Sequence, residues 1–97
     1  MDDMGRRYRR SPNMVYRQIE AESLLVPIKS NVGDMGFIYN LNDVGTFIWE
    51  RLDGENQLSD ITNQIVEEFD VSAEEAQEDL LHFTGQLKKI GAIEAVR

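Results

Sequence analysis

Hydrophobic and polar residues follow a two-residue period between residues 14 and 41, which predicts β-strands. The expected strands span residues 14–19, 24–29 and 36–41 and are rich in Val, Ile, Leu and Tyr, which favour strands. Polar connections separate them, and the second, Asn31-Val32-Gly33-Asp34, contains residues that tolerate the positive φ angles of turns. The simplest arrangement is an antiparallel meander of three strands.

From Asn42 onward the period changes to about 3.6 residues, which predicts three helices. Each helix has an apolar row and a polar residue that can cap its N-terminus. The rows are Val44, Ile48 and Leu52 in the first helix, Ile61, Ile65 and Phe69 in the second, and Ala76, Leu80, Phe83, Leu87 and Ile90 in the third. The expected caps are Asn42, Ser59 and Ser72, the last in a capping box with Glu75.

The expected helices end where the sequence supplies breaks. Asp53-Gly54 ends the first helix, and Lys88, Lys89 and Gly91 end the third. Residues 93–96 then form a short terminal strand. Three strands followed by three helices indicate an α+β fold, a small winged helix-turn-helix-like domain.

The first twelve residues differ from the rest because they are basic and poor in hydrophobic residues. Four arginines surround Tyr8 within residues 6–10, a composition typical of a disordered terminus. An alternative is that this arm folds over an acidic partner or over the domain's own acidic face. We therefore expect a disordered arm over residues 1–12 and one folded domain over residues 13–97.

Length and composition restrict the compartment and the class of protein. The chain has 97 residues, too few for two domains, and its small core leaves association into a homodimer plausible. It has no cysteine, so disulfides, thiolate metal sites and cysteine nucleophiles are excluded and a reducing, cytoplasmic location is expected. Neither a signal peptide nor a membrane-spanning run is visible, so no membrane partner is expected.

Charge is distributed unevenly along the chain. Residues 1–17 contain five arginines and two acids, whereas residues 18–97 contain five basic and sixteen acidic residues. Residues 50–79 are the extreme, with eleven acids and one arginine. Such a segment repels phosphate, and the N-terminal end of the third helix carries Glu74, Glu75 and Glu78 where a DNA reader would carry basic or amide groups. The sequence therefore argues against a nucleic-acid partner.

The residues that perform catalysis or hold cofactors are sparse. His82 is the only histidine and lies off the apolar row, which is typical of a solvated surface residue. Paired carboxylates such as Glu67-Glu68 lie on helices without an apolar pocket that would raise a pKa. No glycine pattern matches a phosphate-binding loop. We expect no catalytic residue, no metal and no cofactor.

One stretch of the sequence resembles a known family. Residues 41–54 read LNDVGTFIWERLDG, which is similar to the LNxxGxxIWxxLDG motif of the PqqD family. The resemblance extends over about residues 14–96, with weaker agreement in the apolar spacing of the helices. Two mild departures are Gln57-Leu58 and Ala92, and the arginine-rich arm is outside the pattern.

The resemblance implies a non-catalytic protein that recognises precursor peptides in pathways of ribosomally made, post-translationally modified peptides. In that family a winged-helix-like domain captures the leader of the precursor as a strand added to the third strand, against the third helix, and presents the core to a radical S-adenosylmethionine maturase. In pyrroloquinoline quinone synthesis the precursor is PqqA and the maturase is PqqE. Relatives serve lasso-peptide and sactipeptide pathways, so the product stays open.

Candidate peptide-binding residues follow from this resemblance and from a helical wheel. On the third helix a mixed polar and apolar flank lies beside the core row and is free for a partner. The expected site consists of Phe37, Ile38, Tyr39 and Asn40 on the third strand and Gln77, Leu81, Thr84 and Lys88 on this flank. Alternative functions are a winged-helix transcriptional regulator, a generic protein-interaction module and a small enzyme.

Overall fold

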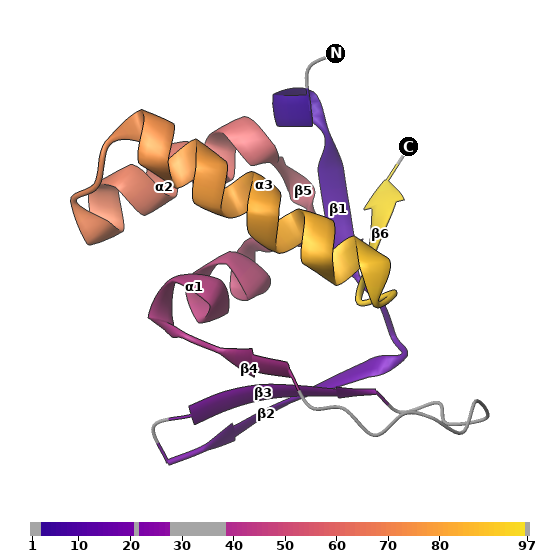
Figure 1. Cartoon of the computed structure of the whole chain (residues 1–97). Helices are drawn as coiled ribbons and strands as arrows, with labels where there is room; N and C mark the ends of the chain where they lie inside the picture. Colours follow the sequence, from indigo (N-terminus) through magenta and orange to yellow (C-terminus); the bar gives the residue numbers. More distant parts are fainter. Residues whose placement is uncertain (1–2, 21, 28–38, 97) are drawn as a thin grey trace.

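The computed structural model of the chain describes residues 3–20, 22–27 and 39–96. Figure 1 shows that α1 lies over the sheet β2-β3-β4, that α2 and α3 lie above α1, and that β1, β5 and β6 stand beside the helices. In chain order the elements are η1 (Asp3–Gly5, a 3-10 helix), β1 (Arg7–Arg10), β2 (Met14–Ile19), β3 (Glu22–Pro27), β4 (Tyr39–Leu41), α1 (Asp43–Arg51), β5 (Asp53–Gln57), α2 (Leu58–Phe69), α3 (Ala73–Lys89) and β6 (Ile93–Val96).

The expected meander is present as an antiparallel sheet with the order β2-β3-β4. Strand β2 pairs with β3 from Met14 opposite Pro27 to Ile19 opposite Glu22. Strand β3 then pairs with β4, with Leu25 opposite Tyr39. Residues 36–38 of the expected third strand and the turn at residues 31–34 lie outside the described residues. The α+β fold class predicted from the sequence is confirmed.

The second sheet corrects the prediction of a disordered arm over residues 1–12. Residues 7–10 form β1, the central strand of a sheet with the order β5-β1-β6. Tyr8 is only 4% exposed, and the Arg9 guanidinium lies 3.1 Å from the carboxylate of Glu94 on β6. The alternative expectation, that the basic segment folds onto the domain itself, is closer to the structure. The domain therefore includes residues before position 13.

The helix caps follow the local rules at two of the three expected positions. The Asn42 side chain accepts a hydrogen bond from the backbone N–H of Gly45 at 2.7 Å, and the Ser72 hydroxyl accepts one from Glu75. The prediction of Ser59 as the second cap was wrong, because α2 begins two residues earlier. Its cap is Gln57, whose backbone N–H donates to the Asp60 carboxylate at 2.9 Å.

The helices are also too short or too polar to span a bilayer, as far as the structure describes the chain.

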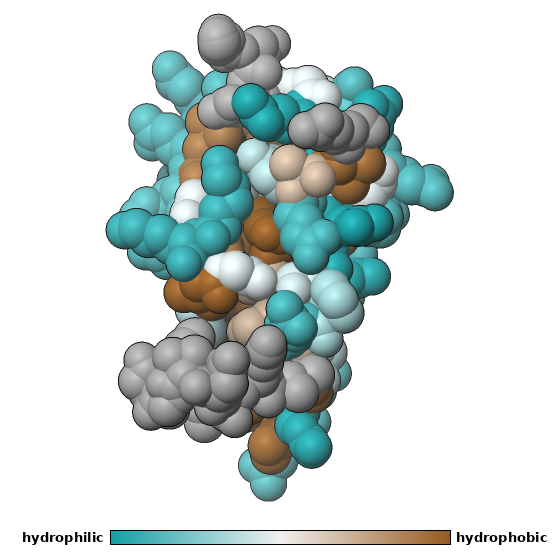
Figure 2. Space-filling view, turned by 90° about the vertical axis from the view of Figure 1, so that its right-hand side faces the viewer, coloured by the Kyte–Doolittle hydropathy of each residue, from teal (hydrophilic) through white to brown (hydrophobic). Residues whose placement is uncertain are grey.

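The hydrophobic core joins both sheets and all three helices. Fully buried side chains come from β3, α1 and the residue that caps its C-terminus, α2 and α3. Figure 2 shows brown apolar residues reaching the surface as small separate patches on the face drawn. The largest of these buried side chains are Leu25, Ile48, Leu52, Leu58, Ile61, Ile65, Leu80 and Leu87. Phe69, Phe83 and Ile90, expected in the apolar rows, are half-buried and pack at the edge of this core.

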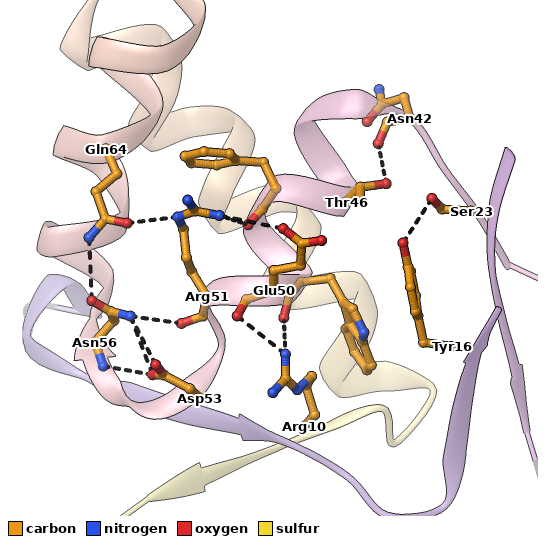
Figure 3. Close-up of polar contacts among 12 residues, drawn as sticks. Arg10, Tyr16, Ser23, Asn42, Thr46, Glu50, Arg51, Asp53, Asn56 and Gln64 are labelled. Atoms are coloured by element: carbon orange, nitrogen blue, oxygen red, sulfur yellow. Dashed lines mark hydrogen bonds and ion pairs between the residues drawn. The ribbon is translucent and has the colours of Figure 1, made fainter. Parts of the chain in front are cut away.

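Polar contacts with β1 and with α2 hold the end of α1 (Figure 3). The Arg10 guanidinium donates to the backbone oxygens of Trp49 and Glu50 at 3.1 and 3.2 Å and lies 6.0 Å from the centre of the Trp49 ring. Arg51 lies 3.5 Å from the Phe47 ring centre and donates to Gln64 of α2. These contacts fix α1, and with it the residues at its N-terminus, relative to the sheets.

Candidate functional site

Strand β4 lies at one end of its sheet and pairs, among the described residues, with β3 alone. In an antiparallel pair, alternate residues direct their backbone N–H and C=O groups away from the partner strand, so an edge strand offers hydrogen bonds to another extended chain. Tyr39 and Leu41 face the helices, where Leu41 is buried, and Asn40 faces the opposite side and is exposed. Within the part of the chain that the structure describes, β4 thus has a free edge, an aromatic inner face and a polar outer face.

Two adjoining hollows run along β4, and we call them together the β4 groove. The larger hollow, about 540 Å³, is lined by Glu22, Ser23, Tyr39, Asn40, Leu41, Asn42, Asp43 and Phe83. The smaller hollow, about 240 Å³, is lined by Tyr39, Asn42, Val44, Gly45, Ile48, Asp79, His82, Phe83 and Gln86. The two share Tyr39, Asn42 and Phe83, so the groove extends from the beginning of β3 to the side of α3.

Contacts between β4 and α3 set the width of the groove. The Tyr39 hydroxyl donates a hydrogen bond to Oε1 of Gln86 at 2.5 Å, and Nε2 of Gln86 lies 3.3 Å from the ring nitrogen of His82. The rings of Tyr39 and Phe83 meet edge to face, with centroids 6.2 Å apart. Partial burial raises the pKa of the Tyr39 hydroxyl above its ordinary value of 10.0, so this group stays a hydrogen-bond donor at neutral pH.

The motif at the beginning of α1 forms part of the groove floor. A β-carbon at position 45 would stand 3.1 Å from the Asn42 side-chain oxygen and 3.5 Å from the Phe83 ring, so glycine leaves room for both. Asn42 meanwhile caps α1. Asn42 and Gly45 both line the groove as well as shaping the beginning of α1. Motif and candidate site therefore coincide in part.

The structure places the predicted site residues unevenly. Tyr39 and Asn40 line the groove, and Phe37 and Ile38 lie outside the described residues. The four expected residues of α3, Gln77, Leu81, Thr84 and Lys88, are not among the described residues that line the groove. The amine of Lys88 lies 3.5 Å from the Tyr8 hydroxyl of β1, and Thr84 is buried and donates to the backbone of its own helix.

The helical wheel explains this difference. At about 100° per residue, the predicted flank lies on one side of the apolar row, and Asp79, His82 and Gln86 lie on the other side. Contacts of Tyr39 with Phe83 and Gln86 identify the second flank as the wall of the groove. Sequence reasoning missed these residues, and the one available signal was that the Phe83 ring lies on their side of the row's centre.

The groove can bind an extended chain. It combines a free strand edge for backbone hydrogen bonds, aromatic rings for side-chain contacts and carboxylates for polar selection, which are the usual elements of peptide recognition by strand addition. His82 is exposed. Within the described ranges, no three His, Asp or Glu side chains gather closely enough to hold a metal ion.

Solved structures resemble this fold. One, lasso peptide synthetase B1 complexed with the leader peptide, superposes with a TM-score of 0.75 at 23% identity and covers 90% of this chain and 96% of that chain. Another, TbiB1 in complex with the TbiA(beta) leader peptide, has a TM-score of 0.73 at 24% identity and covers 89% and 94%. At these identities the likeness establishes a shared fold.

The sequence also matches a protein family. No curated protein matches the chain significantly. The family model of coenzyme PQQ synthesis protein D (PqqD) matches residues 22–93, which include β3, β4, all three helices and the whole lining of the β4 groove. That match covers well over half of the chain, and the motif at residues 41–54 lies within it. The chain therefore belongs to the PqqD family.

Proposed function

We propose that this protein is a non-catalytic peptide-binding protein that captures the leader of a ribosomally made precursor peptide. The leader adds as a strand to the free edge of β4 and lies in the β4 groove against α3. Membership of the PqqD family supports this proposal, as does the shared fold with two proteins solved in complex with leader peptides. The pathway by which the bound core is modified depends on the partner enzyme.

The single observation that carries the proposal is the position of the β4 edge beside Phe83 of α3. Strand addition needs unpaired backbone groups and a surface that selects side chains. β4, which pairs only with β3 among the described residues, supplies the first, and the floor formed by Tyr39 and Phe83 supplies the second. Backbone hydrogen bonds are insensitive to sequence, so most of the selectivity must come from this floor and from the polar rim.

We further propose that the partner enzyme is a radical S-adenosylmethionine maturase. In the PqqD family the precursor is PqqA-like and the maturase PqqE-like in pyrroloquinoline quinone synthesis. The recognition protein then works by holding the leader so that the core reaches the active site of the maturase. This role raises the local concentration of the core and needs no nucleophile or cofactor in the chain itself.

Transcriptional regulation is the weaker alternative. A regulator of this helical arrangement would read the DNA groove with the beginning of α3. Here the exposed residues of that end include Glu74, Glu75, Glu78 and Asp79, which repel phosphate.

A generic interaction module is the other alternative. Such a module would bind many extended peptides, whereas a leader-binding protein depends on one leader.

Isothermal titration calorimetry with the precursor encoded beside this gene tests the proposal. We expect saturable one-to-one binding by the full precursor and by its leader alone. The core peptide alone serves as the matched control and should not bind. Equal binding of leader and core, or binding of neither, would overturn the proposal.

A further inference from the structure

The rim of the β4 groove is acidic. Three exposed carboxylates line it from three different elements: Glu22 at the beginning of β3, Asp43 at the beginning of α1 and Asp79 on α3. None of the three has an ion-pair partner among the described residues, and the described lining contains neither lysine nor arginine. The groove therefore combines a negative rim with the aromatic floor of Tyr39 and Phe83.

Several arginine and lysine side chains make contacts with parts of the fold outside the β4 groove. Arg9 and Arg10 of β1 contact β6 and the end of α1, and Arg7 donates to the backbone of β5. Arg51 stacks on Phe47, and Lys88 lies over the Tyr8 ring. These side chains are turned to other parts of the molecule, so the negative field at the groove is not neutralised by them.

Charge complementarity then selects the occupant. We propose that the peptide strand bound in the β4 groove is a basic-apolar segment, in which a large apolar side chain packs on Tyr39 and Phe83 and a lysine or arginine pairs with Asp43, Asp79 or Glu22. This inference rests on the proposed function, since it specifies which peptide the same groove accepts. An extended chain suits such a rim because its alternate side chains point in opposite directions.

The expected strength of this selection is moderate. Each exposed ion pair changes a dissociation constant by about two- to fivefold, so neutralising the whole rim should weaken binding about tenfold. Because exposed charges are screened, the preference should shrink as the salt concentration rises. An acidic peptide of the same apolar content should bind more weakly than a basic one.

Random dodecamer peptides displayed on phage provide a probe that assumes no particular leader. The full chain is immobilised, binding peptides are selected, and one enriched peptide is synthesised with its basic residues intact and with each replaced by glutamine. Anisotropy then measures both peptides against three proteins. These are the parent chain, the groove variant Glu22→Gln/Asp43→Asn/Asp79→Asn, and the control Glu55→Gln/Glu67→Gln/Glu74→Gln, which changes net charge equally at exposed sites outside the groove.

We expect enrichment of Lys and Arg, about tenfold weaker binding of the basic peptide to the groove variant, and less than about a twofold change with the control. A fourth protein, Phe83→Ala, reports occupancy of the groove independently of charge. If selected peptides lose affinity for Phe83→Ala but show no basic preference, the inference is wrong and the proposed function stands. If their affinity is the same for Phe83→Ala, peptide binding in the groove is itself contradicted.

Discussion

The Tyr39 hydroxyl on β4 donates a hydrogen bond to the side-chain oxygen of Gln86 on α3, across the groove in which we place the peptide. The sequence separates these residues by 47 positions, so the bond reports the tertiary arrangement directly. It joins the strand that would receive the leader to the helix that would select its side chains. The stability and the binding behaviour of the protein should both depend on this pair.

Replacing Tyr39 with phenylalanine removes the hydrogen bond and keeps the ring against Phe83. We expect the free energy of unfolding to fall by about 0.5 to 1.5 kcal/mol, the usual net value of such a bond. Urea denaturation followed by circular dichroism measures this change. Gln86→Ala should produce a similar loss, and the double variant should lose less than the sum of the two, because both remove the same bond.

The pH dependence of this pair has a definite sign. Burial raises the pKa of Tyr39 in the folded state above 10.0, so the unfolded chain releases this proton first. The protonated hydroxyl stabilises the folded state below the unfolded pKa of about 10. This contribution to the free energy of unfolding is lost as the pH rises through the folded pKa. The stability difference between the parent and Tyr39→Phe should therefore shrink above pH about 10. A constant difference there would contradict the role of the hydroxyl.

Phe83 and Leu81 provide a matched comparison of the two flanks of α3. Both are half-buried and pack against the core, but only Phe83 lines the groove. Phe83→Ala should weaken leader binding about tenfold or more, and Leu81→Ala should change it less than about twofold. Calorimetry on variants whose fold is confirmed by circular dichroism tests both. The reverse order of effects would return the site to the flank that the sequence suggested.

Tyr8 tests whether the N-terminal strand belongs to the domain. Its ring is 4% exposed in the central strand of the β5-β1-β6 sheet. Tyr8→Ala should lower the free energy of unfolding by about 3 to 5 kcal/mol, as for other buried aromatic residues. Lys89→Ala, at an exposed position of α3, should change it by less than about 0.5 kcal/mol. Equal melting temperatures for Tyr8→Ala and the parent would instead support the prediction of a disordered N-terminal arm.

The Asp53 carboxylate makes a second contact whose contribution to stability depends on pH, in this case at acid pH. Its carboxylate accepts the backbone N–H groups of Glu55 and Asn56 at 2.9 and 3.0 Å, and these bonds lower its pKa below 3.8. A lowered folded pKa stabilises the protein above the unfolded value, and this contribution is lost as the pH falls through the folded pKa. Melting temperatures of the parent and Asp53→Asn should therefore differ more near pH 6 than near pH 2.5.

The parts of the fold that follow local rules were predictable. Asn42 and Ser72 cap helices because their side chains reach backbone groups only three residues away. β1 was not predictable in this way, since arginines around one tyrosine resemble a solvated terminus. That segment becomes a strand through pairing with residues 53–57 and 93–96, and β5 itself, with the sequence DGENQ, has little strand propensity of its own.

The candidate site was predictable to a similar extent. The third strand and the third helix were the expected elements, and Tyr39 and Asn40 line the groove. A helical wheel shows two flanks beside an apolar row and does not distinguish between them. Only the crossing of α3 over the sheet decides which flank contacts β4. That crossing depends on the packing of α3 against α2 and on the position of both above α1, which a one-dimensional pattern does not contain.

Backbone amide NMR during titration with the leader tests directly whether the peptide binds along β4. We expect the largest shift changes on residues 39–43 and 79–86, along the two walls of the β4 groove, while the amides of the β5-β1-β6 sheet change little. We also expect new protection from hydrogen exchange for part of β4, as a strand is added to its edge. Changes centred on Lys88 and the β1 side of α3, with β4 unaffected, would contradict binding along β4.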